Sequence, residues 1–288
     1  MFYVPVALAL YSAFSFAVSD FAVRLGVRHS SPYTGSVIQA IVHLVIFGLL
    51  LRWAIPPTEI LNPGAWWYLA SGVMDPGIGV ICYFAGISRL GVARGATLIG
   101  TSPLFSSAAA MAFLGERPNA WVWLGTLGIM VGVGALAYEP GNRRRDWAGF
   151  VYLILGAFFF GMAHPLRKLG LGYIPSSVAG LAIAQVGALI ALLLVLPLMP
   201  AGARFNPSAK GLGFYFLHSL GIAVAFFFLF EGLRLGTVSV VVPLVHVFPL
   251  LVILIAWLFL GGKERITRRL LAGAALIVAG AAAITGLG

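Results

Sequence analysis

Long apolar stretches alternate with short clusters of proline, glycine and charge along almost the whole chain. A helix needs about 20 apolar residues to cross the hydrocarbon core of a bilayer. The stretches predicted to be spanning helices are 2–24, 34–54, 65–88, 93–114, 120–138, 147–169, 176–199, 210–234, 237–260 and 268–287. Strands of a membrane barrel would alternate apolar with polar residues, and these stretches do not. The pattern therefore predicts an all-α membrane protein with ten transmembrane helices.

Composition supports this interpretation. Of the 288 residues, 61% are hydrophobic and 9% are charged, and the mean hydropathy is +1.02. So few polar residues cannot cover a soluble globule of this length. Because ten helices leave only short connections, any binding site is expected inside the helix bundle, with the lipid bilayer as the main partner.

The net charge of +10 comes from residues scattered over the helix connections, which argues against a nucleic-acid surface. The connections after the first, third, fifth, seventh and ninth helices hold thirteen basic residues: Arg24, Arg28, Arg89, Arg94, Arg143, Arg144, Arg145, Arg204, Lys210, Lys263, Arg265, Arg268 and Arg269. The opposite side holds five: Arg52, Arg117, Arg167, Lys168 and Arg234. By the positive-inside rule, both termini are expected outside the cytoplasm, in a bacterial inner membrane.

The second half of the chain repeats the first in outline. Residues 13–26 match 157–170 without a gap, and residues 83–91 match 228–236 one position further on. Pro103 recurs as Pro249. Membrane proteins built from two such halves usually move one half against the other around a shared central site, so the repeat indicates a transporter.

Each half is predicted to hold five helices, the first half covering 1–142 and the second 143–288. Because five is odd, the second half enters the membrane from the opposite side. The repeats are therefore expected to be inverted, with a pseudo-two-fold axis in the membrane plane.

The repeated motif resembles a known family. Its elements are Tyr83-Phe84-Ala85, Arg89 to Ala96, Pro103, Phe113-Leu114-Gly115-Glu116, and then Gly125 and Gly128. Together they resemble the EamA repeat of the drug/metabolite transporter superfamily, and a second copy covers 149–286. The resemblance implies a ten-helix secondary transporter. Many members of the family export amino acids and other small metabolites. Family members often carry Trp where this chain has Phe16 and Phe160, and many keep their termini in the cytoplasm.

Asp75 is the first candidate for a substrate-binding or coupling residue. Charged side chains at mid-bilayer are costly and usually functional, and Asp75 lies about ten residues into the third predicted helix. Pro76 follows it and is expected to break the helix. Gly79 and Tyr83 follow Asp75 at four-residue spacing, so the three residues are expected on one face of the helix. The carboxylate can titrate or hold a cationic group; alternatively, protonation or a neighbouring helix neutralises it for structural reasons.

Two equivalent positions carry an aromatic residue and an ionisable residue one turn later. Phe16 and Asp20 lie in the first helix, and Phe160 and His164 lie in the sixth. We expect both pairs to face a common axis, with a helix break at Pro165. An interfacial ion pair between Asp20 and Arg24 is the alternative for the first pair.

The fourth and ninth helices carry the remaining candidates. Thr101 and Ser102 precede Pro103, and His246 precedes Pro249. Proline frees a carbonyl group that needs another partner, so both prolines are expected to break their helices around a central cavity. His246 can relay a proton or bind a carboxylate, or it can be a packing residue held by a hydrogen bond.

Smaller features predict how helices pack. Gly125 and Gly128 in the fifth helix, with Gly273 and Gly280 in the tenth, predict close contact between these two helices. Glu116 and Arg117 stand together at a helix end, where an interfacial ion pair is expected.

The sequence thus favours a secondary transporter that exports small metabolites by alternating access. Amino acids with aromatic or large apolar side chains are the favoured substrates, and a monomer is expected to suffice. The alternatives are a facilitative channel or uniporter, and an intramembrane hydrolase. An enzyme is disfavoured because no nucleophile stands beside a base in a recognisable motif. No metal or cofactor is expected, since the five histidines are dispersed.

Overall fold

Ten helical spans cross the molecule in a computed structural model of the chain, which describes residues 3–90, 92–137, 146–199, 202, 204–259 and 268–287. Seven spans are unbroken helices: α1 (Tyr3–Gly26), α2 (Pro32–Ala54), α7 (Ala120–Ala137), α8 (Trp147–Tyr173), α9 (Ser177–Val195), α10 (Ala209–Leu235) and α13 (Arg268–Leu287). The prediction of ten spans is confirmed, and most helix ends differ from the expected positions by only a few residues.

The third, fourth and ninth spans are interrupted. The third consists of α3 (Gly64–Gly72), the short segment η2 (Val73–Ile78) and α4 (Gly79–Leu90). The fourth consists of α5 (Val92–Ile99) and α6 (Ser102–Leu114), and the ninth of α11 (Val238–Val245) and α12 (Phe248–Phe259). Two short 3₁₀ turns, η1 (Pro57–Leu61) and η3 (Leu196–Leu198), lie in the connections.

Side-chain caps start several of the long helices. The first backbone N–H groups of a helix lack partners within it, and a preceding Ser or Asp can accept one of their hydrogen bonds. Ser31 accepts from Thr34 N before α2, Asp146 from Gly149 N before α8, and Ser176 and Ser208 do the same before α9 and α10. The polar residues that separate the apolar stretches thus define where helices begin.

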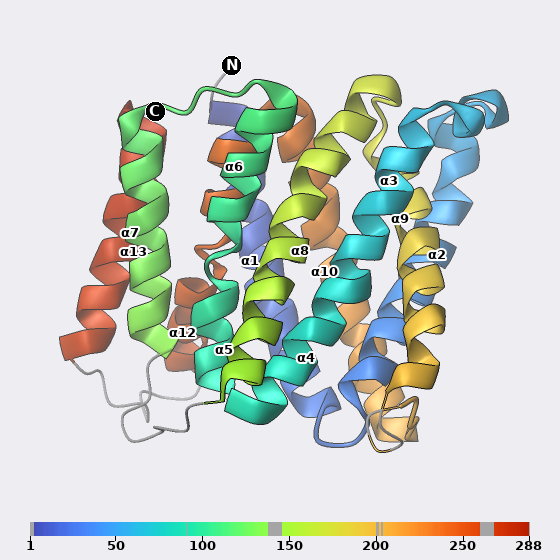
Figure 1. Cartoon of the computed structure of the whole chain (residues 1–288), viewed down its shortest axis with the longest axis horizontal. Helices are drawn as coiled ribbons and strands as arrows, with labels where there is room; N and C mark the ends of the chain where they lie inside the picture. The colour runs from blue at the N-terminus through green and yellow to red at the C-terminus, as the bar shows by residue number, and fades with distance from the viewer. Residues whose placement is uncertain are drawn as a thin grey trace.

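The packing of the spans follows a two-fold pattern. α1 of the first half packs on α10, and its equivalent α8 packs on α3 and α4. The remaining equivalents pack on each other, α2 on α9 and α7 on α13, at opposite ends of the molecule (Figure 1). α6 contacts α8 just as α12 contacts α1. Exchange of the two halves therefore maps these contacts onto one another, as expected for two five-helix EamA-type units in inverted orientation.

Glycine allows α7 and α13 to approach closely. A Cβ atom added to Gly280 would lie 2.5 Å from the carbonyl oxygen of Gly125, and one added to Gly132 would lie 2.7 Å from that of Gly273. The predicted contact between the fifth and tenth helices is confirmed.

The outside of the bundle is strongly apolar. Trp53, Trp66 and Leu194 each expose at least 70% of their surface, whereas all eight residues of α11 are buried. A soluble monomer rarely exposes so many large apolar side chains. Lipid is the medium that suits this surface, and the chain is a multi-pass membrane protein.

Candidate functional site

The break in the third span places Asp75 inside the bundle. Pro76 has no N–H to donate to the preceding turn, and Asp75 (φ −144°, ψ 116°) and Pro76 (φ −92°, ψ 18°) leave the helical conformation. Gly72 and Gly79 flank the interruption. A Cβ atom at Gly72 would collide with the backbone of Ala184 in α9, so the break is pressed against a neighbouring helix.

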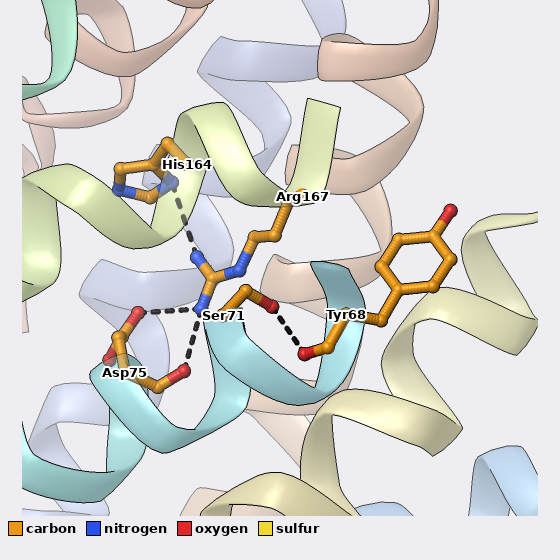
Figure 2. Close-up of polar contacts among 5 residues, drawn as sticks. All are labelled: Tyr68, Ser71, Asp75, His164 and Arg167. Carbon is orange, nitrogen blue, oxygen red and sulfur yellow. Dashed lines mark hydrogen bonds and ion pairs between the residues drawn. The ribbon is translucent and has the colours of Figure 1, made fainter. Parts of the chain in front are cut away.

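Asp75 forms an ion pair with Arg167 of α8 (Figure 2). Arg167 Nη2 donates to Asp75 Oδ2 at 2.7 Å and to the Asp75 backbone oxygen at 2.9 Å. The side chain of Arg167 is 2% exposed and that of Asp75 is 13% exposed. The pair joins the two halves of the chain, because α8 belongs to the second half and η2 to the first.

The guanidinium group of Arg167 has further neighbours. Its Nη1 donates to His164 Nδ1 at 3.2 Å, so His164 is neutral there and carries its proton on Nε2. The rings of Phe226 and Phe230 from α10 lie 5.1 and 5.5 Å from the guanidinium carbon, within the range of cation–π attraction. The charge is thus held by one carboxylate, one imidazole and two aromatic faces.

The breaks of the fourth and ninth spans meet in the same region. Ser102 Oγ lies 2.9 Å from His246 Nε2, and His246 Nδ1 lies 2.9 Å from the carbonyl oxygen of Val242. Because a carbonyl only accepts, Nδ1 carries a proton; when the ring is neutral, Nε2 accepts a hydrogen bond from Ser102 Oγ. Thr101 Oγ1 donates to the carbonyl oxygen of Leu98 at 2.6 Å, which satisfies a backbone group near the end of α5.

The side chains at the three breaks interact with one another. His246 interacts electrostatically with both Asp75 and His164. Figure 2 shows Asp75 and His164 on either side of the Arg167 guanidinium group. Asp75, Arg167, His164, His246 and Ser102 therefore form a polar cluster contributed by the third, fourth, sixth and ninth spans, which we call the central cluster.

The predicted aromatic residues border this cluster. Phe160 fills the space above Gly79, where an added Cβ atom would lie 2.8 Å from its ring. Phe16 packs edge-on against Phe226 and also contacts Phe248 at the start of α12. Apolar rings from spans 1, 6 and 8 thus surround a small group of charged and polar side chains.

Asp20 lies within electrostatic range of Tyr83 and of His218. It therefore approaches the third and eighth spans from the first. The side chain of Arg24, its suggested ion-pair partner, is outside the described part of the chain.

Comparison with known families decides the general assignment. The model of the EamA-like transporter family matches residues 4–138 and again 147–286, which together make up nearly the whole chain. The chain belongs to the EamA-like transporter family. It is a membrane transporter of small molecules built from two EamA domains, and this family is not a family of enzymes. The junction expected near residue 142 lies outside the described residues.

Solved structures agree on the fold. A crystal structure of another protein superimposes with a TM-score of 0.80 over 98% of this chain and 96% of the other, at 16% sequence identity. At that identity the similarity concerns the fold alone. The search of curated proteins found no significant match.

The structure corrects the predicted position of Arg167. The charge count places this residue at the membrane surface, near the end of the predicted helix 147–169, whereas it is buried inside α8 with 1% of its surface exposed. Asp75 is accordingly not the isolated carboxylate that its sequence context suggests. The spacing did contain a signal, since Arg167 follows His164 by one helical turn and thus shares its inward face.

The predicted break at Pro165 is wrong, because α8 runs without interruption from Trp147 to Tyr173. The fixed φ of proline is itself helical, and Pro165 is buried among neighbouring helices that can support the turn with a missing hydrogen bond. Pro76, Pro103 and Pro249, in contrast, all lie at or next to interruptions.

Glu116 does not serve mainly as a partner of Arg117. Its carboxylate accepts hydrogen bonds from Val238 N at 2.7 Å, from Ser239 N at 3.0 Å and from Ser239 Oγ. It thereby caps the N-terminus of α11 in the opposite half, where a negative charge also suits the helix dipole. The sequence pointed to Arg117 because it is adjacent to Glu116. Val238, at the start of the helix that Glu116 caps, lies 122 residues away along the chain.

Lys168 lies one residue after Arg167 and acts at the neighbouring helix end. Its Nζ donates to the carbonyl oxygens of Leu233 at 2.5 Å and Gly236 at 2.9 Å, at the C-terminus of α10. A cation there satisfies carbonyl groups that lack helical partners.

Within the described residues, no group of three or more His, Cys, Asp or Glu side chains is placed to hold a metal ion. The central cluster combines an ion pair, two imidazoles and a hydroxyl group. That arrangement can bind a small polar ligand by ion pairing and hydrogen bonding.

Proposed function

We propose that this EamA-family protein exports amino acids, favouring those with aromatic or large apolar side chains. The observation that carries the proposal is the buried Asp75–Arg167 ion pair, which joins the two halves at a helix break. Opposite charges in an apolar bundle suit a substrate with charged groups, and Phe16, Phe160, Phe226 and Phe230 nearby suit an apolar side chain. The outward direction rests on the resemblance to the exporters of the family.

Alternating access is the mechanism that we propose. The interrupted spans 3, 4 and 9 all contribute to the central cluster, and interrupted helices typically form the binding sites of inverted-repeat transporters. Rocking of one half against the other around this cluster would expose it to each side in turn. Since one chain supplies both halves, we propose that the monomer is the functional unit.

Counterflow in liposomes tests this function. Purified protein would be reconstituted into vesicles preloaded with unlabelled phenylalanine, and uptake of labelled phenylalanine would be followed. A transporter gives transient accumulation that saturates with substrate. Uptake without saturation or counterflow would indicate a channel, and chemical conversion of the substrate would indicate a hydrolase; either result would reject the proposal.

We further propose that both termini lie outside the cytoplasm, in a bacterial inner membrane. The charge bias supports this, and it becomes stronger when the buried Arg167 is left out of the count, because the second side then holds four basic residues against thirteen on the first. The N- and C-termini lie at the same edge of the molecule (Figure 1). A C-terminal reporter that is active only in the cytoplasm should be silent, and a strong signal would reverse the orientation.

A further inference from the structure

Arg167 has an unused hydrogen-bond donor. Its Nη1 and Nη2 atoms bind His164 and Asp75, but its buried Nε has no hydrogen-bond partner among the described residues. An unsatisfied buried donor on a charged group is costly and is rare in native proteins. Such a group needs an acceptor, and the described part of the chain does not supply one.

The surroundings restrict what that acceptor is. Phe226 and Phe230 contact the guanidinium carbon, so a ligand would approach the edge of the group, where its N–H bonds point. A carboxylate is the ligand that best matches this edge, because its two oxygens accept from neighbouring guanidinium donors.

Asp75 is the more accessible member of the ion pair, with 13% of its side chain exposed against 2% for Arg167. When a ligand carboxylate binds Arg167, it competes with Asp75 for the same cation. The displaced carboxylate of Asp75 then needs a positive partner of its own, because an unpaired charge inside the bundle is strongly unfavourable.

We propose that the substrate is a zwitterion that inserts between these two residues, with its carboxylate on Arg167, including Nε, and its ammonium group on Asp75. The inference rests on the proposed transport function and specifies the recognition chemistry of the same site. The substrate replaces one internal ion pair by two external ones, so every charge stays neutralised throughout. Separation of η2 from α8 then couples binding to movement between the halves.

This arrangement explains selectivity by charge. A molecule with only an ammonium group would leave Arg167 without a carboxylate, and a molecule with only a carboxylate would leave Asp75 without a cation. Each case places an uncompensated charge in the bundle. In the empty protein, Asp75 and Arg167 neutralise each other, so the empty site can reorient to the other side of the membrane.

Three probes of similar shape test the proposal. Phenylalanine carries both charges, phenethylamine carries only the ammonium group, and 3-phenylpropionate carries only the carboxylate. Counterflow would be measured for each in vesicles containing the parent protein, Asp75→Asn or Arg167→Gln. The parent should prefer phenylalanine over both single-charge probes by at least about tenfold.

The two variants should change this preference in opposite directions. Asp75→Asn leaves the cation of Arg167 and should raise 3-phenylpropionate relative to phenylalanine by about tenfold or more. Arg167→Gln leaves the carboxylate of Asp75 and should raise phenethylamine relative to phenylalanine by a similar factor. A purely structural ion pair would instead lower transport of all three probes alike, and that result would overturn the proposal.

Controls distinguish failure of this proposal from misfolding of a variant and from failure of the proposed transport function. Glu231→Gln removes the exposed ion pair with Arg234 and should leave the preference of the parent unchanged. The double variant Asp75→Asn/Arg167→Gln, which buries no unpaired charge, should fold and lose the preference for the zwitterion. Ligand-induced shifts in melting temperature would be recorded for any variant that folds but does not transport, and the same opposite shifts in preference are expected. Absence of both transport and binding of all three probes in the parent would reject the proposed function as well.

Discussion

Ser102 and His246 join the two interrupted helices of opposite halves through one hydrogen bond, 2.9 Å long between Oγ and Nε2. Ser102 begins α6 just before Pro103, and His246 follows α11 just before α12. The repeated Pro103 and Pro249 therefore mark two breaks that contact each other directly. A bond at this position connects the two halves of the chain inside the bundle.

Ser102→Ala should destabilise this contact. Removal of the hydroxyl group leaves His246 Nε2 without this partner, at a cost of about 1–3 kcal/mol, so the melting temperature in detergent should fall. Ser106→Ala on the same helix is the matched control, because Ser106 Oγ is buried and has no hydrogen-bond partner among the described residues. Equal effects of the two substitutions would show that the Ser102–His246 bond contributes nothing specific.

Glu116→Ala should weaken the cap on α11. The substitution removes the acceptor of the Val238 and Ser239 N–H groups, and loss of a helix N-cap costs about 0.5–2 kcal/mol. Thermal unfolding measures the effect directly. Glu231→Ala is the comparison, since its partner Arg234 is partly exposed and such pairs contribute about 0–1 kcal/mol. If the two variants unfold alike, Glu116 does not stabilise α11.

The ten spans are predictable from sequence because hydropathy and helix length are local properties. Pro76, Pro103 and Pro249 likewise indicate breaks in the helices that contain them. Asp75 stands out because a carboxylate is rare in an apolar stretch, but its partner Arg167 does not, because it lies near the end of a stretch where basic residues commonly mark a connection.

The remaining contacts depend on how distant segments pack. The cap that Glu116 provides and the bond between Ser102 and His246 join positions 122 and 144 residues apart. Nothing in the local pattern specifies them. The internal repeat narrows the possibilities, since it makes the two breaks equivalent, yet only the three-dimensional packing brings them into contact.

Asp146 should make stability depend on pH in the acidic range. The hydrogen bond from Gly149 N and, to a smaller extent, the nearby Arg89 hold the pKa of Asp146 below its ordinary value. A carboxyl group with a lowered folded-state pKa stabilises the protein above its unfolded pKa of about 3.9, and this contribution is lost as the pH falls through the folded-state value. Asn can cap the helix but does not titrate. The difference in melting temperature between parent and Asp146→Asn should therefore shrink between about pH 6 and about pH 3, and a difference independent of pH would contradict this assignment.

Gly280→Ala tests whether close backbone contact holds the fifth and tenth spans together. The added methyl group would lie 2.5 Å from the carbonyl oxygen of Gly125 and 3.0 Å from Ile129 N, so α7 and α13 must move apart. Overpacking of this kind costs about 1–3 kcal/mol, and the melting temperature in detergent should fall. Gly48→Ala in α2 is the matched control, because nothing lies within 4 Å of its added methyl group. There the better helix propensity of alanine should stabilise the protein by about 0.5–1 kcal/mol. Opposite signs for the same substitution would identify contact with the neighbouring helix as the cause, whereas stabilisation in both variants would mean that α7 and α13 separate without cost.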